Sequence, residues 1–147
     1  DSRLIEEMRS DFPKGRRNIW VDVPGGSEES KGKGGQRNLK EVEAVIDRIR
    51  ILNSKLKNHR PKVGGPWSVA VLTFYRGQLA ELESRFSSIC KQDMSPFRIG
   101  CLEINLGTVD RFQGDEADVV ILSYVRTKSP GFLTSSNRLN VAVTRAR

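Results

Sequence analysis

Arg138 and Arg145 are side chains whose spacing could bring two positive charges to one binding cleft. The apolar residues around them recur as one stripe of a helix: Leu139, Ala142, Val143 and Ala146. Because they are seven residues apart, the two arginines share another face of that helix, within about 20° of rotation. Two guanidinium groups on one side of a docked helix could both face a cleft. The alternative is that they are solvated or form ion pairs with Asp115 or Asp118, the commoner state of isolated arginines.

An apolar run from Val119 to Val125 precedes this helix and must position it. The run contains no polar residue until Ser123, which is typical of a strand buried on both faces of a parallel sheet. A polar turn from Thr108 to Asp118 leads into the run. We therefore expect polar groups at the edges of the sheet, where α/β folds bind their ligands.

The composition is that of one folded domain with an excess of positive charge. The chain has 147 residues, 37% of them hydrophobic, and a net charge of +7, which favours polyanionic partners. After Asp118 the sequence contains five basic residues and no acidic one. A solvated basic face remains the alternative to a nucleic-acid site.

Several classes of site are not indicated. No apolar run approaches the ~20 residues of a membrane span. Cys90 and Cys101 are not part of a CxxC pattern, so neither a zinc site nor a disulfide framework is predicted. We expect reduced thiols in an intracellular protein, cytoplasmic or nuclear, and no metal ligands.

The hydrophobic pattern predicts alternating strands and helices, and hence an α/β sheet with helices on both faces. Asn38 and Glu41 have the spacing of a capping box, which is a sufficient structural explanation for both. The expected elements are a leading helix or linker (1–17, helical at 3–9), a strand (18–23), a flexible loop (24–37), a helix (38–58), a strand (68–74), a helix (77–91), strands at 97–106 and 119–125, and the final arginine-bearing helix.

Three segments closely resemble a known helicase family. TVDRFQGDEADVVILSYVRT and GFLTSSNRLNVAVTRAR resemble motifs V and VI of superfamily 1 helicases, in the group of the up-frameshift helicase and senataxin. SVAVLTFYRGQLAEL resembles motif IV of the same group. The resemblance runs from about Ile19 to the end. It implies a RecA-like three-layer sandwich with a mainly parallel sheet, all of residues 1–147 forming the second RecA-like domain of such an enzyme.

The resemblance also implies what this chain lacks. In the family, ATP with Mg²⁺ lies between two RecA-like domains, and the first domain supplies the Walker lysine and the metal-binding acid. No G-x-x-x-x-G-K-[ST] pattern occurs in these 147 residues. A doubly wound sheet needs one more strand after Arg147, as family members have. We therefore expect a piece of a longer protein, truncated before its last strand.

Site residues follow from the resemblance position by position. Arg145 aligns with the arginine finger, which stabilises charge on the γ-phosphoryl oxygens. Arg138, Glu116, Tyr75 and Gln78 are assigned to ATP. Glu116 would bind the ribose, or be only a turn acid, and Tyr75 would stack on a base or adenine, or be buried against the sheet edge.

Motif V implies contacts to a phosphodiester backbone. Thr108 and Asp110, together with Thr73, are assigned to nucleic acid, and such contacts position a strand without reading its sequence. Asp110 is also a candidate cap for a short helix after it, the role we favour. Gln113 and Gly114 would shape the turn, with Gly114 free to adopt a positive φ.

Motif IV contains one departure from the family pattern. An arginine that reaches the γ-phosphate commonly follows the Gln, and here that position is Leu79. Arg76 could reach the same space, so we include it with Arg145 as a catalytic candidate.

The sequence thus predicts half of an ATP-dependent helicase that moves 5′ to 3′ along single-stranded RNA or DNA. Its partners would be the single strand and the first RecA-like domain, and the chain alone would be inactive. The alternative is a non-hydrolysing nucleic-acid-binding or docking module derived from a helicase.

Overall fold

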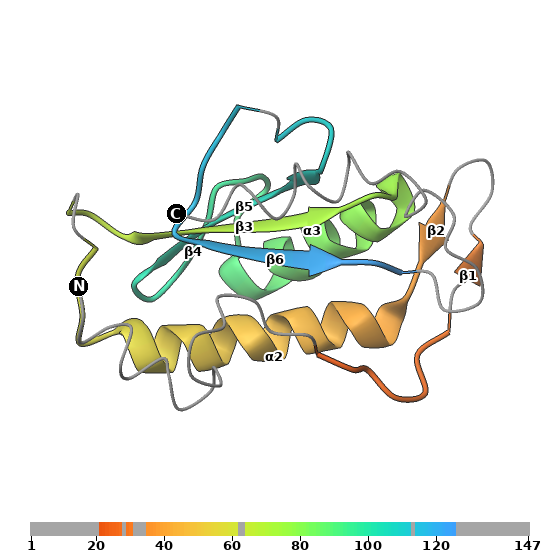
Figure 1. Cartoon of the computed structure of the whole chain (residues 1–147), viewed down its shortest axis with the longest axis horizontal. Helices are drawn as coiled ribbons and strands as arrows, with labels where there is room; N and C mark the ends of the chain where they lie inside the picture. Colours follow the sequence, from red (N-terminus) through yellow and green to blue (C-terminus); the bar gives the residue numbers. More distant parts are fainter. Residues whose placement is uncertain (1–20, 28, 31–34, 62–63, 113, 126–147) are drawn as a thin grey trace.

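The computed structural model describes residues 21–27, 29–30, 35–61, 64–112 and 114–125 (Figure 1). In these residues the elements follow one another as β1 (Glu29–Ser30), β2 (Gln36–Arg37), α2 (Leu39–Leu56), β3 (Trp67–Thr73), α3 (Arg76–Cys90), β4 (Phe97–Ile99), β5 (Leu102–Thr108) and β6 (Val119–Ser123).

The main sheet is mixed and mainly parallel, with the strand order β4-β5-β3-β6. β3 is parallel to both β5 and β6, and β4 is antiparallel to β5. The sequence of β3, WSVAVLT, is a run of apolar residues, and all but Ser68 are buried. The predicted α/β class with a mainly parallel sheet is confirmed.

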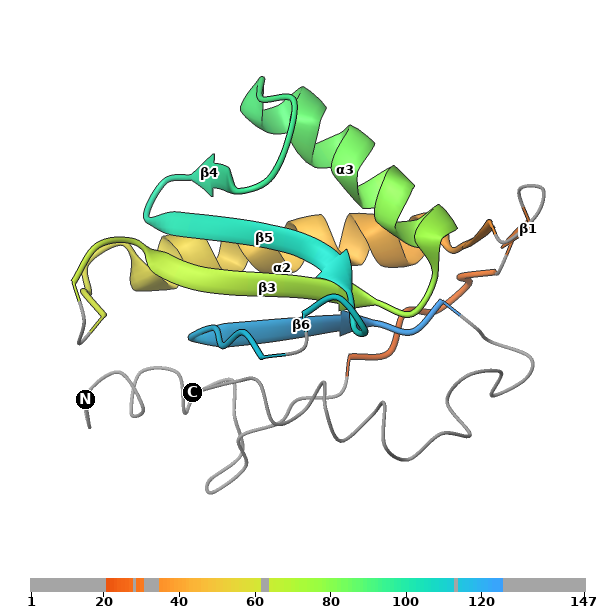
Figure 2. The same cartoon turned by 90° about the horizontal axis from the view of Figure 1, so that it is seen from above.

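Both helices of the described residues cover the same face of this sheet (Figure 2). Ile46 and Ile49 of α2 and Leu82 and Phe86 of α3 are fully buried in one core with β3 and β5. On the opposite face a smaller cluster holds Ala70, Leu72, Val109 and Ala117. The prediction of helices on both faces is therefore not met within the described part of the chain.

β6 is less buried than its sequence suggests. Val119 to Leu122 are half-buried, and Ser123 alone in the strand is fully buried. The expectation of a strand buried on both faces is wrong here, because β6 lies at one end of the described strand order and β3 takes the central position.

α2 and α3 match their predicted ranges to within two residues. Asn38 caps α2, since its side-chain oxygen accepts a hydrogen bond from Glu41 N at 3.2 Å. Along α2 the apolar residues at helical spacing are the buried ones: Val42, Val45, Ile46, Ile49, Leu52 and Leu56.

The predicted strand at 97–106 is instead a hairpin of two strands, β4 and β5. Gly100 adopts φ +55° in the turn between them, a conformation that glycine reaches without a steric penalty. Asn53 of α2 holds this turn, because its Oδ1 accepts from Cys101 N at 3.0 Å. The apolar residues on both sides of Gly100 concealed the break.

The segment predicted as a flexible loop at 24–37 contains the antiparallel pair β1 and β2. Arg37 explains this, because its guanidinium forms ion pairs with Glu29 at 3.1 Å and with Glu81 of α3. A bond to Glu81 is the main cause that raises the pKa of Arg37.

Other expected elements are only partly within the described residues. Val21 to Val23 form no strand, contrary to the expected strand at 18–23. The leading helix and the arginine-bearing helix lie outside the described residues. No helix within the described ranges is long and apolar enough to cross a membrane.

Candidate functional site

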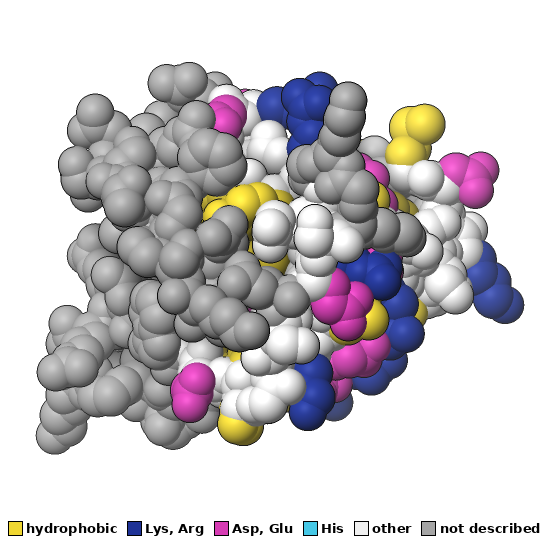
Figure 3. Space-filling model, turned by 90° about the vertical axis from the view of Figure 1, so that its right-hand side faces the viewer, with side chains coloured by type: hydrophobic (Ala, Val, Ile, Leu, Met, Phe, Trp, Pro, Cys, Tyr) yellow, Lys and Arg dark blue, Asp and Glu magenta, His cyan; other side chains and the backbone are white. Residues whose placement is uncertain are grey.

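Three loops meet where β3, β5 and β6 end. Thr73 is the register partner of both Thr108 and Ser123, the last residues of their strands. Val109 N donates to Thr73 O at 3.0 Å and so ties the first two loops together. The ends of β3 and β6 also lie beside the start of α2 (Figure 1), and Figure 3 views this face, which we call the carboxyl edge. Ligands of open α/β sheets bind at such an edge.

Three of the motif IV residues point into the protein at this edge. Thr73 and Gln78 are fully buried and Tyr75 is 6% exposed. The Gln78 amide accepts from Asn38 N at 2.8 Å and donates to Asn38 O at 3.2 Å and Ser123 Oγ at 2.9 Å. The Thr73 hydroxyl accepts from Tyr75 N at 3.3 Å. These side chains present almost no surface to ATP or nucleic acid, so we assign them structural roles in place of the expected contacts.

Residue 77 must be glycine because the backbone of α3 packs closely against the backbone near Gly35. A Cβ on Gly77 would lie 2.6 Å from the carbonyl carbon of Gly35, far inside van der Waals contact. The glycine therefore lets the start of α3 dock against the segment before β2. Together with the burial of Gln78, this explains the Gly-Gln pair of motif IV in structural terms.

Arg76 is the exposed charged residue at the start of α3 in the motif IV segment. It is the first residue of α3, whose first-turn amide groups and dipole favour an anion. Leu79, at the position of the family's arginine, is half-buried and lines a shallow groove.

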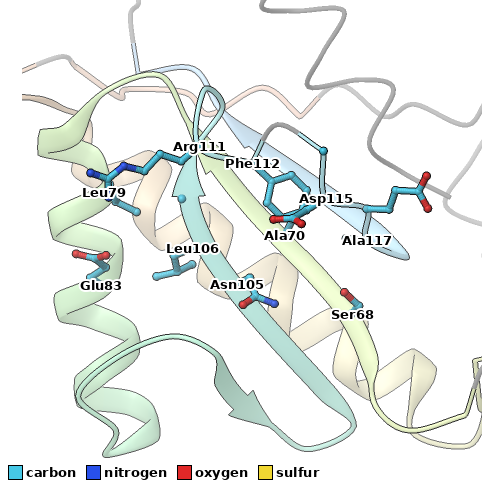
Figure 4. Close-up of a pocket in the computed structure, with 13 residues that line it drawn as sticks. Ser68, Ala70, Leu79, Glu83, Asn105, Leu106, Arg111, Phe112, Asp115 and Ala117 are labelled. Atoms are coloured by element: carbon cyan, nitrogen blue, oxygen red, sulfur yellow. The ribbon is translucent and has the colours of Figure 1, made fainter.

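That groove runs around the end of β5 (Figure 4). Leu79 and Glu83 of α3 lie on one side of the strand, and Phe112 and Asp115 of the loop after β5 lie on the other. The exposed Arg111 extends over the strand end toward Leu79. Arg111 was not singled out from the sequence, although it lies inside the motif V segment, and it adds a positive charge beside Leu79.

Thr108 and Asp110 open the loop after β5. Thr108 is half-buried, and its carbonyl accepts from Arg111 N at 3.1 Å and Phe112 N at 3.2 Å. Asp110 is exposed, but the residues after it form turns, so the short helix that it was expected to cap is not found in the described residues. Gly114 has φ +98°, which confirms the positive φ expected there. Gln113 lies outside the described residues.

Glu116 is exposed and lines the same groove as Leu79. It precedes Asp118 by two residues, and Asp118 is bonded to Ser68 at the opposite end of β3. Asp118 Oδ2 accepts from Ser68 N at 2.9 Å, and Asp118 N donates to Ser68 O at 2.9 Å. Glu116 nevertheless shares one groove with Leu79 and Glu83 of α3, and its contact to a ribose stays a prediction.

The Glu41 carboxylate makes contacts that capping does not require. It accepts from Ser123 Oγ at 2.9 Å, Tyr124 N at 2.6 Å and Val125 N at 2.8 Å. The reciprocal bond of a capping box is absent, because Asn38 N donates to Gln78 instead of Glu41. The sequence signal was the Asn-x-x-Glu spacing, which we interpreted as a local helix cap alone.

Aromatic rings also meet at the carboxyl edge. The rings of Phe74 and Tyr124 lie 6.0 Å apart at 37° to each other. Both are half-buried, and burial raises the pKa of Tyr124. This pair, rather than the buried Tyr75, carries the accessible aromatic surface of these loops.

Two expected site residues, Arg138 and Arg145, lie outside the described residues. Within the described ranges no group of three or more His, Cys, Asp or Glu side chains could hold a metal ion. The Cys90 and Cys101 thiols are free, and burial raises the pKa of both.

Several known proteins match most of this chain. The AAA domain family matches residues 2–147. Helicase sen1 of Schizosaccharomyces pombe is 37% identical over an alignment of 126 positions, which covers 83% of this chain and 7% of that protein. The regulator of nonsense transcripts 1 homolog of Drosophila melanogaster is 31% identical over an alignment of 147 positions, which covers 95% of this chain and 11% of that protein.

A third relative is archaeal. It is an uncharacterized ATP-dependent helicase of Methanocaldococcus jannaschii, 30% identical over 128 residues, which are 87% of this chain and 16% of that protein. The chain thus spans only a small part of the length of each of these relatives. It belongs to the AAA domain family, within the up-frameshift and senataxin-like group of superfamily 1 helicases.

Proposed function

We propose that this chain is the second RecA-like domain of an ATP-dependent helicase that moves 5′ to 3′ along single-stranded RNA or DNA. The observation that carries the proposal is the family match over residues 2–147, with relatives that are named as helicases. The order of motifs IV, V and VI in the sequence supports the assignment to the second domain. The first domain, with its Walker residues, belongs to the longer protein.

ATP is the cofactor of this proposal, and the residues at the carboxyl edge fit an anionic group. Arg76 is exposed at the start of α3, and Arg111 is exposed beside Leu79. Bound ATP supplies the phosphoryl group, and Mg²⁺ is held by the first domain. Arg145 would supply a positive charge to the γ-phosphoryl oxygens, where negative charge accumulates during hydrolysis. Glu116, an exposed carboxylate, accepts hydrogen bonds from the ribose.

Nucleic acid is bound through its backbone in this proposal. Thr108, half-buried at the end of β5, and the exposed loop at Asp110 carry the contacts. Thr73 is excluded from them by its burial. The net charge of +7 favours association with a polyanion and makes it dependent on salt. The chain alone has no ATPase activity and binds single strands weakly.

The test is the steady-state ATPase activity of the full-length protein, with and without single-stranded RNA and DNA. Replacing Arg145 with Ala lowers kcat by about 10³ or more, as the loss of an arginine finger does, and leaves single-strand binding nearly unchanged. Arg50→Ala is the matched control, because the Arg50 side chain is 63% exposed on α2 and forms an ion pair with Asp47 of the same helix. Equal kcat values for Arg145→Ala and Arg50→Ala would refute the finger assignment.

Leu79 favours a second function, that of a non-hydrolysing nucleic-acid-binding or docking module. It occupies the position of an arginine that reaches the γ-phosphate in the resembled family, and its half-buried side chain offers no charge. The same assay separates the two functions. Turnover stimulated by one of the polymers supports the motor, and binding without turnover on either polymer supports the module.

A further inference from the structure

A buried network of polar side chains joins three elements at the carboxyl edge. Asn38 at the start of α2, Gln78 in α3 and Ser123 at the end of β6 are each 2% exposed or less. The Gln78 amide bonds to Asn38 and Ser123, and Ser123 Oγ donates to Glu41 Oε1. Buried polar groups that are all bonded to one another make such a network rigid.

Glu41 connects this network to the end of β6 through its carboxylate. One oxygen of its carboxylate accepts from Tyr124 N, and the other accepts from Val125 N. A helix cap needs none of these bonds, because the Asn38 side chain already accepts from Glu41 N. The carboxylate therefore acts on the chain that leaves β6.

Val125 has an unusual backbone conformation at this point. Its φ is +70° and its side chain is 1% exposed. A β-branched residue in the left-handed region is strained, and it persists only where its surroundings determine it. Both peptide groups of Val125 are held, its N–H by Glu41 and its carbonyl by Asn38 Nδ2 at 3.4 Å.

We propose that Glu41 is a positioning residue, which fixes the left-handed turn at Val125 and so sets the direction in which the chain leaves β6. The segment that follows carries Arg138 and Arg145. The inference rests on the proposed function, because that function places these arginines at ATP. Glu41 itself touches no nucleotide.

The first test is Glu41→Gln in the full-length protein. The Gln amide has one acceptor oxygen and places an N–H₂ group against a backbone N–H, so the turn at Val125 loses a partner. We expect kcat for ATP to fall about tenfold or more, because small displacements of catalytic groups have effects of this size, with KM for ATP within about twofold. Glu43→Gln is the control, since Glu43 lies on the same helix and forms an exposed ion pair with Arg85 at 2.6 Å. It leaves kcat unchanged.

The second test removes the strain that Glu41 maintains. Glycine adopts a positive φ without a steric cost, so Val125→Gly added to Glu41→Gln restores most of the lost kcat. Val109→Gly in the same background is the matched control, because Val109 is buried at the same edge but has no positive φ. A merely structural role for Glu41 predicts no recovery from either glycine. If Glu41→Gln fails to fold, Glu41→Asp with and without Val125→Gly provides the same comparison.

Amide hydrogen exchange on the same proteins separates this inference from the proposed function. Glu41→Gln speeds exchange at the Tyr124 and Val125 amides, and Glu43→Gln does not. If the two variants show this exchange pattern but the wild-type protein has no ATPase activity, the proposed function fails and the positioning role stands. Normal exchange at both amides in Glu41→Gln, or an unchanged kcat in an active enzyme, overturns the inference.

Discussion

β3 and β6 are joined by polar contacts at both of their ends, and the two ends differ in construction. At the amino end Asp118 and Ser68 exchange two hydrogen bonds of 2.9 Å, and both residues are half-buried. At the carboxyl end Ser123 is fully buried and bonded to two other elements through Gln78 and Glu41. A strained residue, Val125, lies two positions further on. Polar burial and backbone strain thus collect at the edge where we propose that ligands bind.

The two ends also differ in what they contribute energetically. A left-handed conformation at Val125 costs about 1–3 kcal/mol. Each hydrogen bond to the charged Glu41 carboxylate contributes about 1.5–3 kcal/mol, so the three bonds that it accepts are sufficient to offset this cost. The amino end has no such cost to offset. Strain maintained by a dedicated set of bonds is a feature of functional sites.

The largest effect on stability is expected at Gln78. Gln78→Leu keeps the approximate size of the side chain but leaves the backbone N–H of Asn38 without its partner and removes the amide that donates to Ser123 Oγ. The Asn38 carbonyl keeps its bond from Val42 N. Because the groups that lose a partner are buried, the free energy of unfolding falls by about 3 kcal/mol, measured by urea titration. Gln92→Leu, which loses only exposed hydrogen bonds, is the control. An equal loss in the free energy of unfolding in the two variants would mean that the buried bonds of the carboxyl end stabilise the fold no more than exposed ones do.

A smaller effect is expected at the amino end. Asp118→Ala removes the acceptor of Ser68 N, but water can replace it because Ser68 is half-buried. The free energy of unfolding then falls by about 1 kcal/mol, and ATPase activity of the full-length protein is retained. A loss as large as that of Gln78→Leu would remove the distinction between the two ends.

Local patterns made much of the fold predictable from sequence. The spacing of Val42, Ile46 and Ile49 identified α2, and the apolar run from Ser68 to Phe74 identified β3 to within one residue at each end. The hairpin at Gly100 was missed because apolar residues flank it on both sides, and β1 and β2 were missed because Arg37 holds them through a partner on α3, 44 residues away. Contacts between distant residues leave no periodic signal.

The sequence predicted which residues gather at the candidate site better than it predicted whether their side chains are exposed or buried there. Arg76 is exposed, whereas Gln78 and Thr73 are buried. A glutamine side chain serves equally well as a ligand contact and as a buried bridge, and only the positions of Asn38 and Ser123 decide between them. The same holds for Glu41, whose spacing from Asn38 fits a capping box although its carboxylate bonds to β6.

The smallest expected effect is on the pH dependence of stability, through Tyr124. Burial raises the pKa of Tyr124 in the folded protein, so on increasing pH the unfolded chain loses this proton first. The contribution to stability is therefore complete below the ordinary tyrosine pKa of about 10 and is lost as the pH rises through the folded pKa. Because Tyr124 is only half-buried, the change is small. Tyr124→Phe, which keeps the ring beside Phe74, makes the loss of stability in alkali less steep.

Spectroscopy tests this directly, because the chain contains only two tyrosines. In a Tyr75→Phe variant of the chain, near-ultraviolet absorbance follows Tyr124 alone. The titration midpoint of the folded protein should lie above that of the same variant in urea. A folded midpoint at or below the unfolded one would show that the loop after β6 is open to water. The packing that we describe at the carboxyl end would then stop at Ser123, and the turn at Val125 would have to be held by hydrogen bonds alone.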